Sequence, residues 1–166
     1  MDYNTFAWKN FNHFSMQIIC KHFNEFSAKE FYIIMALRCE VFMIEQHCEE
    51  TELDGRDLDC YHLCFYDNNV LAAYARLLPP GLSYEEMAIG RVVTHGNYRR
   101  KGLGKELVKT SIDKCYEYFG NGPIKIGAQL HLQKFYEAFG FIRISDVYEE
   151  GGIPHIKMRK EPANDK

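Results

Sequence analysis

The chain has 166 residues, 46% of them hydrophobic, which is enough apolar material for one globular domain with a full core. Its formal net charge of −3 argues against a nucleic acid or another polyanion as the primary partner. No apolar run reaches the length of a membrane span, and residues 1–15 do not have the apolar region of a signal peptide. We therefore expect a cytoplasmic protein that binds neither nucleic acid nor membrane.

The chain divides into three parts. Residues 1–15 form an extension rich in aromatic residues, residues 16–160 form a single domain, and residues 161–166 form a polar tail. No repeat or linker interrupts the middle part, so we expect one continuous domain there.

The first elements of the domain are a strand at residues 17–23 and a helix that begins at Ser27. Ser27 and Glu30 have the spacing of a capping box, in which each side chain accepts a hydrogen bond from the other residue's backbone. The helical pattern continues to Phe42, and Arg38 is the one polar residue in its apolar stripe.

An acidic segment follows this helix. Its carboxylates are too many for a core, so we expect an exposed, solvated loop, and a rim that attracts a cationic substrate is the alternative. The acidic residues are Glu45, Glu49, Glu50, Glu52, Asp54, Asp57 and Asp59.

Six further strands and two helices are expected after the acidic segment. Turn residues rich in Gly, Pro, Asn and Asp separate these elements. The expected strands are residues 61–66, 70–78, 89–94, 124–128, 141–144 and 155–158, and the expected helices are residues 103–119 and 132–139.

The six cysteines contain no Cys-x-x-Cys pair, and we expect reduced thiols. Cys60, His62 and Cys64 would share one face of a strand, an arrangement that suits either a zinc site or a packed sheet face. We favour the packed face and expect no metal.

The segment from Arg99 to Gly104 is the strongest functional signal. It lies between an expected strand and an expected helix, and it combines three basic residues with two glycines. A helix that begins at such a loop presents unpaired N–H groups and a partial positive charge. The segment therefore indicates a binding site for a phosphate.

Two common phosphate loops do not match. Gly96 and Gly102 are one residue too far apart for the P-loop of nucleoside triphosphatases. The fingerprint of dinucleotide-binding proteins requires a third glycine where Leu107 stands.

The pattern instead resembles the pyrophosphate loop of the GNAT superfamily of acyl-coenzyme A-dependent N-acyltransferases. Arg99, Gly102 and Gly104 match its Arg/Gln-x-x-Gly-x-Gly/Ala motif. The segment from Gln129 to Phe141 is similar to the second GNAT motif, with Gln129 where the family has Asn and with Tyr136 at the family's tyrosine. Two motifs in the right order make a chance match improbable.

Several further segments resemble the ElaA-like branch of this superfamily, and together the likeness covers residues 16–159. These segments are Leu37 to Phe42 with Glu45-Gln46, Leu53 to Gly55, Tyr74 to Arg76, Ile89 to Val93, and Val147 to Glu150 with Gly152 to His155.

The resemblance implies an α/β (α+β) fold of the GNAT type. Its sheet is mixed and mostly antiparallel, with six to seven strands and about four helices, and strands four and five splay apart around acetyl-coenzyme A. The implied acetyl-coenzyme A site comprises Val92, Val93, Thr94, Arg99, Arg100, Lys101, Gly102, Leu103, Gly104, Lys105, Gln129, Phe135 and Tyr136.

The resemblance also implies catalytic roles. Tyr136 is the candidate acid that protonates the leaving thiolate, although it also belongs to an apolar stripe. The fourth strand carries no carboxylate, so the base that deprotonates the amine has three candidates, Glu45, Glu149 and His155, beside removal of the proton by water. We expect the acceptor to contact Glu45, Tyr148, Glu149 and His155.

These observations predict an N-acetyltransferase that moves an acetyl group from acetyl-coenzyme A to a primary amine by direct attack in a ternary complex. The acceptor is a small molecule or a peptide, and the sequence does not identify it. A homodimer is compatible with the sequence. The alternative is a catalytically silent GNAT-like module that senses acetyl-coenzyme A or binds a protein.

Overall fold

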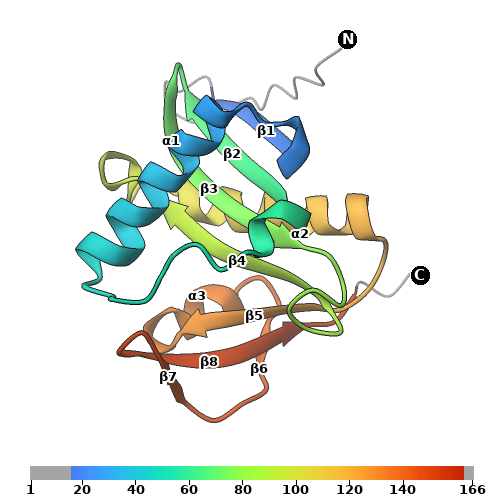
Figure 1. Ribbon diagram of the computed structural model, residues 1–166. Coiled ribbons are helices and arrows are strands. Elements are labelled where there is room, and N and C mark those ends of the chain that lie inside the picture. Colours follow the sequence, from blue (N-terminus) through green and yellow to red (C-terminus); the bar gives the residue numbers. More distant parts are fainter. Residues whose placement is uncertain (1–15, 163–166) are drawn as a thin grey trace.

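The computed structural model describes residues 16–162 (Figure 1). The predicted extension at residues 1–15 lies outside the described residues. The described chain forms one eight-stranded sheet in the order β1-β2-β3-β4-β5-β8-β6, and β7 pairs with β8. Among the strand pairs of residues 16–162, only β4 and β5 are parallel to each other. The strands are β1 Met16–His22, β2 Tyr61–Asp67, β3 Val70–Leu78, β4 Met87–Thr94, β5 Ile124–Gln129, β6 Ile142–Arg143, β7 Tyr148–Glu150 and β8 Ile153–Lys160.

Helices cover both faces of the sheet. Figure 1 shows α1 in front of β2 and β3 and α2 behind the sheet. Short 3-10 turns join several elements, and a π-helical segment extends α1. The α-helices are α1 Ala28–Arg38, α2 Leu103–Phe119 and α3 Gln133–Glu137, and the π-helical segment is Cys39–Glu45.

Each face of the sheet has its own hydrophobic core. Alternation along β2 sends Leu63 and Phe65 into the core beneath α2 and Cys64 into the core beneath α1. Leu107 of α2 and Ile34 of α1 are among the fully buried residues of these two cores. The sheet is thus held rigidly between two layers, and its central strands can position a site.

The predicted fold is confirmed, with small differences in the number of elements. The sheet has eight strands within residues 16–162 rather than six to seven, because Tyr148–Glu150 also pairs with β8. That segment has no apolar alternation, so its sequence predicted only a connection. The same residues contain three α-helices rather than about four.

The capping box at the start of α1 is confirmed. Ser27 Oγ accepts a hydrogen bond from the Glu30 N–H over 3.3 Å, and Glu30 Oε2 accepts one from the Ser27 N–H over 2.7 Å. The hydrogen bond from Lys21, followed by those from Ser27, lowers the pKa of Glu30 to about 2. Beyond Arg38 the helix widens into π turns, a deviation often found at functional sites.

The expectation of a fully exposed acidic loop is wrong for two of its residues. Glu49, Glu50 and Asp59 are exposed as expected. Glu52 and Asp57 are only 6% and 4% exposed, because arginines from the sheet and α1 pair with them. Sequence composition identified the carboxylates but not their distant partners.

His62 uses both of its ring nitrogens within the protein. Nε2 bonds to the Asp57 carbonyl over 3.0 Å, so it carries the proton, and Nδ1 then accepts from the Tyr74 hydroxyl over 2.6 Å. Burial lowers the pKa of His62 to about 4. Burial also raises the pKa of the neighbouring thiols Cys60 and Cys64. This face of β2 is therefore packed against α1.

Candidate active site

The candidate site lies where β4 and β5 separate. The two strands pair only near their first residues, Met87 with Ile124 and Ala88 with Lys125. Further along, β4 pairs with β3 and β5 pairs with β8, and no strand of the described residues fills the space between them. Figure 1 shows the two strands meeting at the right and diverging to the left. Their facing edges can bind the amide groups of a ligand as another strand would.

A β-bulge interrupts β4 at Arg91. Tyr74 lies opposite Val93 and Arg76 lies opposite Gly90, so β4 has one residue more than β3 between these pairs. Arg91 has a φ of 52°, in the left-handed region that residues other than glycine rarely adopt. A bulge breaks the regular ladder and re-aims the residues that follow it. Val92, the next residue, lines both cavities described below.

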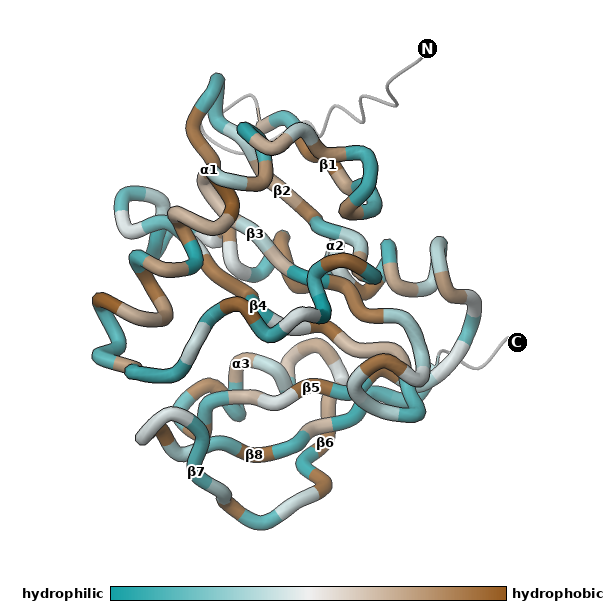
Figure 2. Tube along the Cα trace, viewed as in Figure 1, coloured by the Kyte–Doolittle hydropathy of each residue, from teal (hydrophilic) through white to brown (hydrophobic). Residues whose placement is uncertain are grey.

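The loop between β4 and α2 curls into an anion cradle. Arg100 and Gly102 have left-handed φ angles of 62° and 83°, and the N-cap residue Gly102 has no side chain that could cap the helix. The N–H groups of Leu103 and Gly104 in the first turn of α2 have no acceptor within that helix. Figure 2 shows this loop as hydrophilic at the left of the view. Loop and helix dipole together suit a phosphate.

Two basic side chains fix the shape of the cradle. Arg99 donates from Nε to the Thr94 carbonyl over 2.9 Å and from Nη2 to Glu45 Oε2 over 2.8 Å. Lys101 donates from Nζ to the Asn97 carbonyl over 2.9 Å. The cradle is thus formed by contacts of the protein itself.

A cavity of about 500 Å³ extends from this cradle along β4, and we name it the cradle cavity. Eleven of the thirteen residues expected to bind the coenzyme line it, and Lys101 and Leu103 are the two that do not. The eleven are Val92, Val93, Thr94, Arg99, Arg100, Gly102, Gly104, Lys105, Gln129, Phe135 and Tyr136.

A second cavity of about 430 Å³ lies between the splayed strands, the acidic segment and the β7–β8 turn, and we name it the loop cavity. The acidic segment contributes Glu50, Glu52 and Asp54, and the β7–β8 region contributes Glu150 and His155. The wall from β4 includes the bulge.

The two cavities share six lining residues and therefore meet. The shared residues come from the π-helical segment and its end, from β4, from β5 and from the start of α3. They are Phe42, Gln46, Val92, Gln129, Leu132 and Tyr136. A group held in one cavity can therefore react at this junction with a group held in the other.

Tyr136 lies at the junction and is only 7% exposed. Its ring packs edge to face against Phe135 and Phe141. Burial raises the pKa of Tyr136 to about 12, so the phenol is protonated at neutral pH. It can donate a hydrogen bond, whereas full transfer of its proton to a thiolate would be uphill.

Gln129 ends β5 and also lies at the junction. Its Nε2 donates to Gln46 Oε1 over 3.1 Å, so β5 is joined to the end of the π-helical segment. Gln46 and Phe42 were not predicted as site residues. Both residues belong to segments that resemble the ElaA-like family, and this resemblance could have identified them as candidate site residues.

His155 lines the loop cavity and lies opposite Gln129 in the β5–β8 ladder. Its Nδ1 bonds to the Ile153 carbonyl over 2.8 Å, so in the neutral ring Nδ1 carries the proton. The lone pair then lies on Nε2. A histidine with this tautomer one strand away from the junction can accept a proton from an incoming amine.

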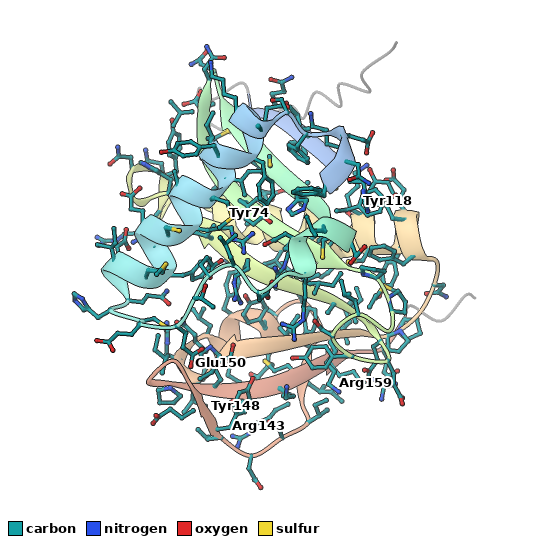
Figure 3. All side chains as sticks on the ribbon, in the orientation of Figure 1. Tyr74, Tyr118, Arg143, Tyr148, Glu150 and Arg159 are labelled. Carbon is teal, nitrogen blue, oxygen red and sulfur yellow. The ribbon has the colours of Figure 1, made fainter. Side chains whose placement is uncertain are left out.

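The other residues expected on the acceptor side are distributed differently. Glu45 lines the cradle cavity, where it pairs with Arg99. Tyr148 and Glu149 line neither cavity, while the adjacent Glu150 lines the loop cavity. Figure 3 labels Tyr148 and Glu150 in the part of the molecule formed by β5, β7 and β8. Alternation along β7 separates the two glutamates.

Buried ion pairs hold the acidic segment against the sheet. Arg38, which is fully buried, donates from Nε to Glu52 Oε1 over 2.6 Å and from Nη1 to Asp57 Oδ1 over 2.7 Å. Burial by itself would raise the pKa of Asp57, but Arg38 and Arg76 hold it below its usual value. The wall of the loop cavity is therefore fixed by charges from α1 and β3.

Further ion pairs connect these buried residues to the surface of the loop cavity. Arg76 donates to both carboxylate oxygens of Asp54 over 2.8 and 2.6 Å, and Arg91 donates from Nε to Glu52 over 2.8 and 3.0 Å. Burial by itself would raise the pKa of Asp54, but its hydrogen bonds with Arg76 hold it well below its usual value. Arg76 and Arg91 belong to segments that resemble the ElaA-like family, but they were not predicted to line the site.

Within residues 16–162, no helix has the length and apolar character needed to cross a membrane.

Comparisons with known proteins agree on one family. A family model described as an acetyltransferase (GNAT) domain matches residues 24–162. The chain is 41% identical over 142 residues to protein ElaA of Escherichia coli strain K12, and the match covers 84% of this chain and 93% of that protein.

Two solved structures are also similar. One is an acyl-CoA N-acyltransferase from Pseudomonas aeruginosa, with 39% identity and a TM-score of 0.83 over 88% of this chain and 99% of the other. The other is Escherichia coli ElaA, with 38% identity, the same TM-score and the same coverage.

Proposed function

Because the chain belongs to the GNAT acetyltransferase family and to its ElaA-like branch, we propose that it transfers an acetyl group from acetyl-coenzyme A to a primary amine. The amine attacks the thioester directly while both substrates are bound. The meeting of the cradle cavity and the loop cavity at Tyr136 and Gln129 is the observation that carries this proposal.

The donor occupies the cradle cavity in this proposal. Backbone N–H groups of the cradle, including those of Gly102 and Gly104, bind the pyrophosphate, and Arg100 and Lys105 add positive charge. The pantetheine amides bond to the free edge of β4, and the Gln129 amide bonds to the same arm. A backbone N–H at Val93 or Thr94 faces the thioester oxygen and stabilises the negative charge that develops there.

Tyr136 donates a hydrogen bond to the leaving sulfur. Its position at the junction and its protonated state at neutral pH support this role. A donor that is already protonated and buried requires little reorganisation during the reaction.

The amine reaches the thioester from the loop cavity, and it must lose its proton before it attacks. We propose His155 as the base, because its Nε2 lone pair is available and it lies opposite Gln129. Glu150, which lines the same cavity and forms no ion pair within the described residues, is the alternative. Glu45 is less suited to this role since it pairs with Arg99 in the cradle cavity.

The test is a panel of primary amines incubated with the protein and acetyl-coenzyme A. Mass spectrometry of the acetylated amine is the preferred readout, because free protein thiols such as Cys39 and Cys48 would react with thiol reagents. Acetylation of at least one amine, dependent on the protein, is the expected result. Tight binding of acetyl-coenzyme A with no acetylation across the panel would favour the silent sensing module instead.

A further inference from the structure

The guanidinium of Arg91 is only partly used by the protein. Its Nε donates to both oxygens of Glu52, but among the described residues its two terminal nitrogens make no hydrogen bond. Nη2 also lies 3.9 Å from Asp54 Oδ2, which is within ion-pair range but too long for a hydrogen bond. The side chain is 27% exposed, so the terminal nitrogens can reach a ligand.

Arg91 also lies beside the junction of the two cavities. It lines the loop cavity and directly precedes Val92, which lines both cavities. Its guanidinium lies 5.9 Å from the centre of the Phe42 ring, and Phe42 is another shared residue. A group bound by Arg91 would therefore lie close to the reacting amine.

The ion-pair network around Arg91 carries more positive than negative charge. Each of its carboxylates pairs with an arginine, but two buried polar atoms, Asp57 Oδ2 and Arg76 Nε, have no hydrogen-bond partner among the described residues. Of these two residues, Arg76 lines the loop cavity. The network contains the cations Arg38, Arg56, Arg76 and Arg91 and the anions Glu52, Asp54 and Asp57. The surplus charge is that of Arg56, whose side chain is 48% exposed and therefore largely screened by solvent.

We propose that Arg91 binds the carboxylate of an acceptor whose carboxylate lies next to its amine, as in an amino acid. This inference rests on the proposed acetyl transfer at the same site. The planar pair of terminal nitrogens suits a carboxylate in a bidentate arrangement. His155 and Glu150 on another wall of the cavity are placed to receive the amine.

The acidic segment by itself suggested a cationic acceptor, but its pairing alters that expectation. Glu52 and Asp54 are neutralised by arginines. Glu50 and Glu150 line the cavity without an ion pair within residues 16–162, yet both are exposed to solvent, which screens their charge. The partly buried Arg91 therefore has the stronger influence on the acceptor.

The first experiment measures binding, so that it does not depend on turnover. The protein is saturated with coenzyme A, and its affinities for N-acetylglycine and N-acetylglycinamide are compared by calorimetry or NMR. We expect the carboxylate ligand to bind at least about 10-fold more tightly than the amide, a typical effect of one charged bidentate contact. In Arg91→Gln this preference should be lost.

Two further variants make the result specific. Arg91→Lys keeps the positive charge but loses the planar pair of terminal nitrogens. It should therefore keep only part of the preference for the carboxylate ligand. Arg143→Gln removes an exposed arginine that lines neither cavity, labelled at the lower edge of Figure 3, and it should keep the full preference. Circular dichroism of each variant checks that the fold is retained.

The second experiment measures acetylation of matched amines, for example glycine against glycinamide and phenylalanine against phenethylamine. A higher kcat/KM for the carboxylate member, abolished in Arg91→Gln, supports the inference. Equal binding of the acid and amide ligands, or a preference for diamines over amino acids, would overturn it. Arg91-dependent binding of N-acetylglycine without acetylation of any amine would leave this inference standing and contradict the proposed function.

Discussion

Arg99 donates a hydrogen bond from Nη2 to Glu45 Oε2 over 2.8 Å, and this ion pair joins the anion cradle to the end of the π-helical segment. The two residues are 54 positions apart in the sequence. Their side chains are 41% and 37% exposed, so the pair is partly screened by solvent. In the proposed complex a pyrophosphate would compete with Glu45 for Arg99.

This competition predicts the effect of Glu45→Gln. Removal of one negative charge from the cradle cavity should tighten the binding of coenzyme A by about two- to fivefold, a typical size for an exposed pair. Calorimetric titration at low and high salt would measure it, and the gain should shrink at high salt. Glu40→Gln, on the same π-helical segment but outside both cavities, is the matched control. A fall in kcat of about 100-fold would instead identify Glu45 as the base.

Tyr136→Phe tests the proposed donor to the leaving sulfur. The ring and its packing are kept, so the affinity for coenzyme A should change little, while kcat should fall by about 10- to 100-fold. Because burial raises the pKa of Tyr136 to about 12, its ionisation should not shape the pH–rate profile below about pH 10. Tyr118→Phe serves as the control, because the Tyr118 hydroxyl donates to the Cys20 carbonyl and neither residue lines a cavity. An unchanged kcat in Tyr136→Phe would rule out the assignment.

His155→Gln tests the proposed base. The loss of kcat/KM in His155→Gln, relative to the wild type, should be largest near neutral pH. This loss should become smaller at alkaline pH, where more of the amine is already deprotonated in solution. Rates over a pH series with one acceptor would show this narrowing. Glu149→Gln, on β7 and outside both cavities, should behave like the wild type. If Glu150→Gln has the pH-dependent defect and His155→Gln does not, Glu150 is the base.

Gly102→Ala tests the backbone of the cradle. Gly102 has a φ of 83°, so a side chain there costs about 1–2 kcal/mol of backbone strain. We expect a several-fold loss of coenzyme affinity and a slightly lower Tm. Gly96→Ala is the control, because Gly96 has no positive φ and nothing lies within 4 Å of an added Cβ. Equal coenzyme affinity in the two variants would show that the left-handed backbone conformation at Gly102 does not contribute to coenzyme binding.

Buried His62 predicts a loss of stability in mild acid. Burial lowers its pKa from 6.5 to about 4, so the unfolded chain binds a proton before the folded one does as the pH falls. The contribution of neutral His62 is present above about pH 6.5 and is lost as the pH falls toward 4. Linkage gives a decrease of about 2 kcal/mol in the free energy of unfolding between pH 7 and pH 4.5.

Thermal denaturation at these two pH values would measure the decrease. His62→Gln should be less stable at pH 7 but should depend less on pH over this interval. His131→Gln, at an exposed position, should keep the dependence of the wild type. A wild-type Tm that is the same at pH 7 and pH 4.5 would contradict the prediction.

The sequence by itself predicted the loop and helix start that form the proposed donor side of the site. The cradle depends on local features, namely glycines at fixed spacing and the start of a helix, and these are written into consecutive residues such as Arg99 to Gly104. The alternation of apolar residues likewise gave the long strands and both faces of the sheet. Short β7 lacks that alternation and was not predicted as a strand.

Only the tertiary structure showed which residues line the proposed acceptor side. Arg38, Glu52 and Arg91 are far apart in the sequence, but Glu52 pairs with both arginines in the structure. Because of this pairing, the acidic segment forms a cavity wall on which the guanidinium of Arg91 is partly free. Strand register brought His155 opposite Gln129 and left Glu149 outside both cavities. Such outcomes depend on which distant charges meet in a low-dielectric interior and on which face of a strand a residue occupies, and neither is encoded in local spacing.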